Sequence, residues 1–345
     1  MKDIKLNFNY SIGNNKPCFI IAEIGSNHDN SYSKAIKLIN KAKEAGADGV
    51  KFQIFSADKH YSKYTPGFKY LKKKNTYNLI KKLEIDRNWI KKLKNYCDKK
   101  KIIFFASPCD LEAIKILKNI NTKLYKVASF DITDLNLIKN IAKLNKPVIL
   151  STGMCSETDI SDAIKTCKKY GNNKIILLQC TSLYPAPKVI SNLNSIKTMR
   201  DKFKVITGYS DHTLDEDAAL MSICLGSKVL EKHFTLSKKL KGPDHKFACE
   251  PQEFKKMVNK IRLFEKMMGD GKKKGPNKLE IEMFKKGRRS IHAVRNIKKG
   301  EILKFKDIII KRPGLGIKPK DLTKILNKKV KKNILKDKWI TKDMI

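Results

Sequence analysis

Apolar and polar positions alternate along the chain as short β-rich runs separated by longer amphipathic stretches. The runs occupy residues 18–25, 49–55, 102–108, 124–129, 147–152, 175–180, 204–210 and 228–234. Eight strand patterns separated by helical patterns predict an α/β fold, a closed parallel (β/α)8 barrel of the TIM type. An open, doubly wound sheet is the alternative, although its phosphate-binding glycine fingerprint is absent.

Helical periodicity marks the stretches between the runs. Residues 31–46 place Ile36, Ile39, Ala42 and Ala45 on one face, and Gly46 gives a stop signal. A last helical pattern over 250–269 precedes residues 271–284, which are rich in glycine, lysine and proline and are typical of a linker. Residues 1–270 are therefore predicted to form the barrel domain, with a short β-hairpin over 1–17.

The pattern changes after the linker. Residues 285–345 contain short β runs and turn glycines, with no helical pattern before 320–328. We expect a second, small, mostly β domain there. A domain of about sixty residues buries little core by itself, so we expect it to need a partner surface, which favours a homodimer.

Composition narrows the classes of function. The formal net charge of +41 suggests nucleic acid as a partner. However, the lysines are spread over the polar faces of most predicted helices, and Phe, Ile, Asn and Lys are abundant together, as in proteins from AT-rich genomes. We therefore expect no nucleic-acid partner. We also expect the positive electrostatic field of the protein to attract anionic substrates.

Cysteine use and hydropathy indicate the compartment. The eight cysteines form no CxxC pair, and several lie in apolar runs. The first residues lack an apolar signal core, and no apolar stretch approaches the roughly 18 residues of a membrane span. We expect a reduced, soluble, cytoplasmic protein with no membrane partner.

Polar residues occur inside the predicted strands, where burial is costly unless they are paired or functional. Glu23, Lys51, Gln53, Lys126 and Glu231 interrupt four of the runs. In such barrels the active site lies at the carboxyl ends of the strands. These residues are therefore candidates for catalysis or binding, and structural ion pairs are the alternative.

Two of the six histidines stand at the ends of the seventh and eighth runs. Those strands are neighbours in a closed barrel, so His212 and His233 could converge, beside Asp211 and Glu231. Imidazole with carboxylate and open water positions suits a divalent ion such as Mn²⁺ or Mg²⁺. Hydrogen-bonded structural histidines are the alternative interpretation.

Several motifs together resemble the sialic acid synthase family, the enzymes that make nonulosonic acids. They are IIAEIGSNHDNS, AGADGVKFQIF, ILSTGM, CTSLYPAP, GYSDHT, LEKHFTL, GPDH and KRPGLG, in this order from about residue 18 to the end. The tail resembles that family's antifreeze-like (SAF) domain. In relatives this domain reaches across a dimer and closes the partner's active site, so the resemblance implies a homodimer with a swapped C-terminal domain.

The resemblance implies a condensation of phosphoenolpyruvate with the aldehyde of an open-chain N-acetylated hexosamine of the N-acetylmannosamine type. Water adds, phosphate leaves, and a divalent metal held by His212 and His233 is required. The residues matching catalytic positions are Glu23, Glu231 and Lys51. Those matching phosphoenolpyruvate-binding positions are Lys51, Ser107, Lys126, Ser129, Ser151, Ser182 and Ser210, and those matching sugar positions are Gln53, Asp131, Tyr184, Asp244 and Arg312.

The sequence departs from neuraminate-type members at three places. Asp131 replaces a glutamate, Ser182 replaces an asparagine of some relatives, and residues 286–294 lack the usual aromatic entry to the tail. Pseudaminate or legionaminate synthesis, the same reaction on a diacetamido hexose, is therefore an alternative. A barrel aldolase or lyase using Lys51 or Lys126 as a Schiff-base nucleophile is a different class.

Overall fold

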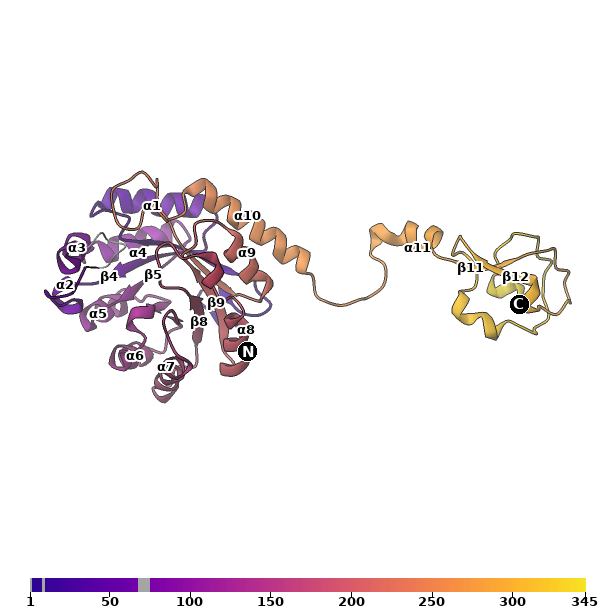
Figure 1. The fold of residues 1–345 in the computed structure, drawn as a ribbon, viewed down its shortest axis with the longest axis horizontal. Coiled ribbons are helices and arrows are strands. Elements are labelled where there is room, and N and C mark those ends of the chain that lie inside the picture. Colours follow the sequence, from indigo (N-terminus) through magenta and orange to yellow (C-terminus); the bar gives the residue numbers. More distant parts are fainter. Residues whose placement is uncertain (1, 8–9, 68–74) are drawn as a thin grey trace. The chain divides into compact units, whose positions relative to one another are not determined.

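Eight parallel strands close into a barrel in the first part of the chain (Figure 1). They are β3 (Phe19–Gly25), β4 (Gly49–Ile54), β5 (Ile103–Pro108), β6 (Tyr125–Val127), β7 (Val148–Ser151), β8 (Ile175–Cys180), β9 (Ile206–Asp211) and β10 (Val229–His233). Strand β10 pairs with both β9 and β3, which closes the barrel. The predicted fold is confirmed.

This computed structural model describes residues 2–7, 10–67 and 75–345. The chain divides into two compact units, Met1–Gly269 and Asp270–Ile345. No helix in the described part of the chain is both long and apolar enough to cross a membrane.

Helices connect consecutive strands and surround the barrel (Figure 1). They are α1 (Tyr32–Glu44), α2 (Ala57–His60), α3 (Thr76–Leu83), α4 (Trp89–Lys99), α5 (Leu111–Asn119), α6 (Leu135–Ala142), α7 (Glu157–Lys169), α8 (Ser195–Phe203), α9 (Asp217–Cys224) and α10 (Pro251–Met268). Helix α1 starts where the Ser31 side chain accepts a hydrogen bond from the Lys34 amide. Its buried face includes Leu38, whereas the predicted Ile36 is only half-buried, because the face is rotated slightly from the prediction.

Alternation along the strands builds two apolar layers. Outward side chains such as Val50 and Phe52 pack with the helices. Inward side chains near the amino ends, such as Phe19 and Ile103, form a separate cluster with Ile12 of the N-terminal hairpin, β1 (Ile4–Lys5) and β2 (Ser11–Ile12). The barrel is therefore filled with apolar groups at the amino ends of the strands, and only the carboxyl ends remain for polar chemistry.

The second unit has its own small core. Strands β11 (Ser290–Ala293) and β12 (Ile308–Lys311) pair antiparallel, and Ile291, Leu303 and Ile334 are buried around them. The remaining elements are α11 (Ile281–Gly287) and the 3-10 helices η4 (Lys278–Glu280), η5 (Phe305–Asp307), η6 (Pro319–Lys324) and η7 (Lys342–Met344).

Within this unit, the secondary structure differs from the prediction at two places. The predicted linker 271–284 includes η4 and the start of α11, because Asn277 and Glu280 form a capping box that nucleates a helix. The helical pattern at 320–328 gives only the short η6, and the chain turns at Asn327, which adopts a φ of 63° and donates its amide to the Leu303 carbonyl.

Candidate active site

A cavity opens at the carboxyl ends of the barrel strands. Its walls include all of the predicted site residues except Ser182 and Arg312. These lining residues are Glu23, Lys51, Gln53, Ser107, Lys126, Ser129, Asp131, Ser151, Tyr184, Ser210, His212, Glu231, His233 and Asp244. Their side chains converge because strand alternation turns every second residue inward, and the barrel brings eight strand ends to one rim.

Two lysines and two glutamates form a buried cluster at the floor of the cavity. Lys51 Nζ lies 3.0 Å from Glu231 Oε1 and 3.4 Å from Glu23 Oε2. Lys126 Nζ lies 3.7 Å from the same oxygen of Glu231. All four side chains are almost completely buried. Because charges at these distances interact strongly away from water, each group sets the protonation of the others.

The two carboxyls of this cluster differ in their protonation. Burial opposes ionisation of Glu231, but the charges of Lys126 and Lys51 outweigh it and lower its pKa to about 2. Burial of Glu23 prevails over the attraction of Lys51 and raises the pKa of Glu23 to about 7. The pKa of Lys51 is raised, since burial is outweighed by the two glutamates, whereas burial lowers the pKa of Lys126. Glu23 is therefore the carboxyl suited to exchange a proton near neutral pH.

The backbone at the end of β3 shapes the surroundings of Glu23. The ladder with β4 is irregular between Glu23 and Gly25, and Gly25 has a φ of 52°. A Cβ atom on Gly25 would lie 3.2 Å from Glu23 Oε1 and 3.4 Å from Gln53 Nε2. Gln53 Nε2 donates a hydrogen bond of 2.8 Å to Glu23 Oε1. Glycine is therefore required here both for its conformation and for the close approach of these side chains.

A group of hydroxyls lies beside the lysines. The side-chain oxygens of Ser107 and Ser151 are buried without a hydrogen-bond partner in the protein. Ser210 Oγ donates to Glu231 Oε1 at 3.0 Å, and Ser129 Oγ accepts from the Gly153 amide at 3.0 Å. Unpaired buried hydroxyls are costly. Together with two ammonium groups they make a site that an anion would satisfy.

Ser182 lies behind this group. Its hydroxyl is also buried without a partner, and a Cβ atom on Gly153 would lie 2.2 Å from it. The same Cβ atom would lie 3.0 Å from Ser129 Oγ. Ser182 therefore supports the serine group next to Gly153 and is not among the residues that line the cavity.

His212 and His233 lie side by side, with ring centroids 5.4 Å apart. His212 Nδ1 donates to the Thr181 carbonyl at 2.8 Å, which leaves its Nε2 for another ligand. Burial, followed by the charge of His212, lowers the pKa of His233 well below its usual range, and its Nδ1 is buried without a hydrogen-bond partner. Asp244 Oδ2 lies 3.8 Å from that nitrogen. Two adjacent imidazoles beside a carboxylate fit a divalent ion that water or substrate also coordinates, and ion binding would require both rings to be neutral.

An aromatic side chain covers the two imidazoles. The Tyr184 ring lies 4.3 Å from that of His212 and 5.9 Å from that of His233, measured between centroids. Asp131 ends a single 3-10 turn, η2 (Ser129–Asp131), that follows β6. Tyr184 and Asp131 are thus at the cavity wall, and their role in sugar binding stays a prediction.

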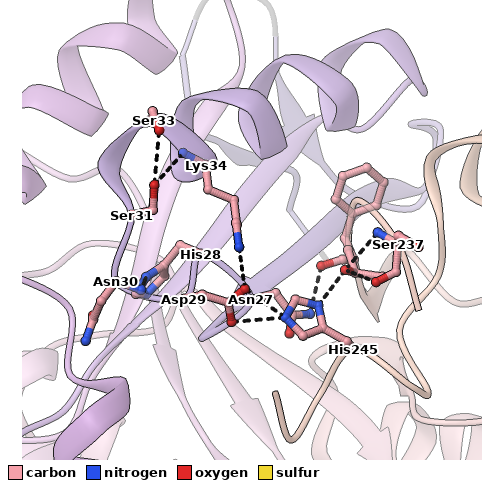
Figure 2. Close-up of polar contacts among 11 residues, drawn as sticks. Asn27, His28, Asp29, Asn30, Ser31, Ser33, Lys34, Ser237 and His245 are labelled. Atoms are coloured by element: carbon pink, nitrogen blue, oxygen red, sulfur yellow. Dashed lines mark hydrogen bonds and ion pairs between the residues drawn. The ribbon is translucent and has the colours of Figure 1, made fainter. Parts of the chain in front are cut away.

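The loop that carries Asp244 is fixed by a buried histidine next to it. His245 Nε2 donates to Asp29 Oδ1 at 3.0 Å, and His245 Nδ1 lies 2.7 Å from Thr235 Oγ1 (Figure 2). Lys34 at the start of α1 binds Asp29 at 2.6 Å. This clamp (Asp29, Lys34, Thr235 and His245) joins the loops after β3 and β10.

Arg312 belongs to the second unit, where its Nε donates to the Gly287 carbonyl at 2.6 Å. Sequence reasoning also missed several lining residues. Among them are His60, Cys109 and Cys180, whose side chains can act as metal ligands. His60 ends α2 after β4, Cys109 directly follows β5 and Cys180 is the last residue of β8. These positions at the carboxyl ends of strands were the available signal, but lone histidines and cysteines are more often structural.

A closed parallel barrel whose rim gathers amines, carboxyls, hydroxyls and imidazoles is the architecture of a barrel enzyme. Comparison with known proteins agrees with that class. Residues 38–273 match the NeuB family model, and residues 288–345 match the SAF domain. The chain belongs to the NeuB family of synthases.

Three relatives represent the similarity. An N,N'-diacetyllegionaminic acid synthase of Campylobacter jejuni is 40% identical over 94% of this chain and 99% of its own. A pseudaminic acid synthase of the same species is 36% identical, covering 94% of this chain and 96% of its own. The crystal structure of the N-acetylneuraminic acid synthetase of Leptospira borgpetersenii, solved with citrate, superimposes with a TM-score of 0.74 and 34% identity, covering 81% of this chain and 94% of that one.

Proposed function

We propose that the protein condenses phosphoenolpyruvate with the open-chain aldehyde of an N-acetylated hexosamine, releasing phosphate and a nine-carbon sugar acid. The observation that carries this proposal is the buried group of Lys51, Lys126 and unpaired serine hydroxyls beside two adjacent imidazoles. A phosphate and a carboxylate would neutralise the ammonium groups and satisfy the hydroxyls.

The reaction forms one carbon–carbon bond and one carbon–oxygen bond, and it breaks one carbon–oxygen bond. Carbon 3 of phosphoenolpyruvate attacks the aldehyde carbon, whose oxygen takes up a proton. Water adds to carbon 2, and the bond from carbon 2 to the phosphate oxygen breaks, leaving the keto acid. Glu23, with its pKa of about 7, is suited to accept the proton of that water, and Gln53 holds its carboxyl in place.

Glu231 has a different role in this proposal. Its carboxylate stays ionised because Lys126 and Lys51 face it, and its pKa is about 2 after they outweigh the effect of burial. A carboxylate that is held ionised in this way is a weak base, so we do not assign proton transfer to Glu231. It positions Lys51 and Ser210 for the anion instead.

A divalent ion, Mn²⁺ or Mg²⁺, held by His212 and His233 would supply Lewis-acid polarisation of the aldehyde. Tyr184, Gln53, Asp131 and Asp244 surround the remaining space and are proposed to bind the sugar. The swapped homodimer and a contribution of Arg312 to sugar binding remain predictions from the family resemblance.

A diacetamido hexose is the second candidate for the sugar. Two relatives named for legionaminic acid share 40% and 36% identity with this chain, a pseudaminic acid synthase shares 36%, and the N-acetylneuraminic acid synthetase shares 34%. Replacement of a glutamate by Asp131 in the cavity wall is also the kind of change that alters the room for a substituent.

The test is phosphate release from phosphoenolpyruvate with Mn²⁺ and each sugar in turn: N-acetylmannosamine and the diacetamido-dideoxy precursors of pseudaminate and legionaminate. We expect release with one of them and none without a sugar. No release with any of them would reject the proposal. Trapping of a pyruvate adduct by borohydride on Lys51 or Lys126 would instead support the Schiff-base class.

A further inference from the structure

A second group of metal-binding side chains lies in the same cavity. His60, Cys109 and Asp131 each offer one ligand atom, and these atoms all lie within 4.8 Å of one another. His60 Nε2 is 3.6 Å from Asp131 Oδ1, longer than a hydrogen bond. Within the described ranges, no other three histidine, cysteine or acidic residues gather in this way.

The fold explains why these three residues meet. His60 ends α2 after β4, Cys109 directly follows β5, and Asp131 lies in the turn after β6. These strands are consecutive neighbours in the barrel, so each contributes one side chain to the same sector of the rim. His212 and His233 come from the ends of β9 and β10, with β3 between β10 and β4. The two groups therefore belong to different sectors of one cavity.

The donor atoms decide which ion would bind. Burial raises the pKa of Cys109, so its thiol has to release its proton to bind a metal. An imidazole nitrogen, a cysteine sulfur and a carboxylate form a ligand set that suits Zn²⁺, which takes three protein ligands and keeps a fourth position open in reactive sites. Mn²⁺ and Mg²⁺ prefer oxygen and have little affinity for thiolates. All three residues line the cavity, so the open position faces it.

We propose that His60, Cys109 and Asp131 form a second cation site, selective for Zn²⁺, in the wall of the active-site cavity. Ion binding there occupies Asp131, a residue assigned above to the sugar. Zn²⁺ therefore inhibits by excluding the amino sugar, a consequence that rests on the proposed function, whereas ion binding itself does not.

Cobalt is the probe, because Co²⁺ substitutes for Zn²⁺ and a cobalt–thiolate bond gives a near-ultraviolet charge-transfer band. The full-length chain is freed of metal and titrated with Co²⁺. We expect the band in the parent, its loss in Cys109→Ser, and its weakening with one fewer bound equivalent of Co²⁺ in His60→Ala. His60 is partly exposed, so its replacement leaves the fold intact even if Cys109→Ser disturbs it.

Two other cysteines serve as matched controls. Cys155 is partly buried in the loop after β7, and its replacement by serine should leave the band unchanged. Cys180 Sγ lies 3.8 Å from His212 Nδ1 and is the competing source of a thiolate ligand. A band that survives Cys109→Ser or disappears in Cys180→Ser overturns the proposal.

A kinetic measurement then tests the consequence. With Mn²⁺ saturating, added Zn²⁺ should raise the KM for the amino sugar without changing that for phosphoenolpyruvate, and His60→Ala should weaken this inhibition at least ten-fold. If the cobalt band is lost in Cys109→Ser but the parent turns over no sugar, the second cation site is supported and the proposed function is rejected. Inhibition that competes with phosphoenolpyruvate rejects the assignment of Asp131 to the sugar side.

Discussion

At the scale of single residues, the two buried glutamates show how different surroundings give different pKa values to identical side chains. Glu231 faces two ammonium groups, whereas Glu23 is close to one and accepts a hydrogen bond from a neutral amide. The additional positive charge beside Glu231 outweighs its burial, and the pKa values of the two carboxyls diverge. This difference supports the proposed role of Glu23 in proton transfer.

Glu23→Gln should therefore remove the pH dependence of turnover. In the parent, the pKa of Glu23 is raised by burial to about 7, so kcat should rise with pH as the carboxyl loses its proton around that value. We expect the variant to lose about 10²-fold in kcat, and its residual rate to be flat across this range. A steady-state pH profile measures both.

Asp244 is the comparison for that experiment, because burial raises its pKa to about 6. Asp244→Asn should keep the rise near pH 7. If the rise disappears in Asp244→Asn and persists in Glu23→Gln, the base has been assigned to the wrong carboxyl.

His233→Ala tests the metal site. Loss of one of two imidazoles should reduce Mn²⁺-dependent phosphate release by about 10²-fold or more, a barrier change of about 3 kcal/mol. Mn²⁺ binding, measured by electron paramagnetic resonance, should weaken in parallel. The circular dichroism spectrum should stay unchanged, because the fold is kept. Turnover equal to that of the parent would remove this metal assignment.

At the scale of elements, strand ends supply the chemistry and loops hold it in position. The clamp joins the loop after β3 to the loop after β10, and the latter carries Asp244 toward His233. His245 is completely buried although its side chain is polar. Both of its ring nitrogens have partners, as most buried polar groups do, and these contacts hold the loop in place.

His245→Gln should loosen the loop without removing a group from the cavity. Because residues behind a metal or substrate ligand typically contribute 10–100-fold, we expect the KM for the amino sugar to rise about ten-fold with a smaller change in kcat. Thr235→Val, which removes only one of the two contacts, should have a smaller effect in the same direction. If both variants are less stable than the parent but keep its KM for the amino sugar, the clamp has a purely structural role.

At the scale of the whole molecule, the two units have separate cores and separate family matches. Every predicted site residue except Arg312 belongs to Met1–Gly269. The first unit contains the closed barrel and the apolar layers on both sides of its strands. We therefore expect the first unit to fold by itself.

A chain ending at Gly269 should consequently stay folded, with a barrel melting temperature within about 4 °C of the parent, corresponding to less than about 1 kcal/mol. Arg312→Ala in the full chain should raise the KM for the amino sugar, and truncation should raise it at least as much. Activity of both variants equal to the parent would show that the second unit takes no part in sugar binding.

The sequence by itself determined the features that depend on local spacing. Alternation and period located eight strands, and strand direction placed Lys51, Lys126, Glu231 and His233 at one rim. Side-chain phase along a strand follows from backbone geometry alone, so these residues could be found without coordinates. The family motifs added the serines, which have no distinctive pattern of their own.

Only the tertiary structure decided what depends on distances between segments. The sequence did not show which of the two glutamates has the higher pKa, because the pKa of each depends on lysines that lie on other strands. The meeting of His60, Cys109 and Asp131 was equally hidden, since 49 and 22 residues separate these positions along the chain (109 − 60 and 131 − 109). Electrostatic coupling and metal coordination act through a few ångströms of space, and only the closed barrel brings such segments together.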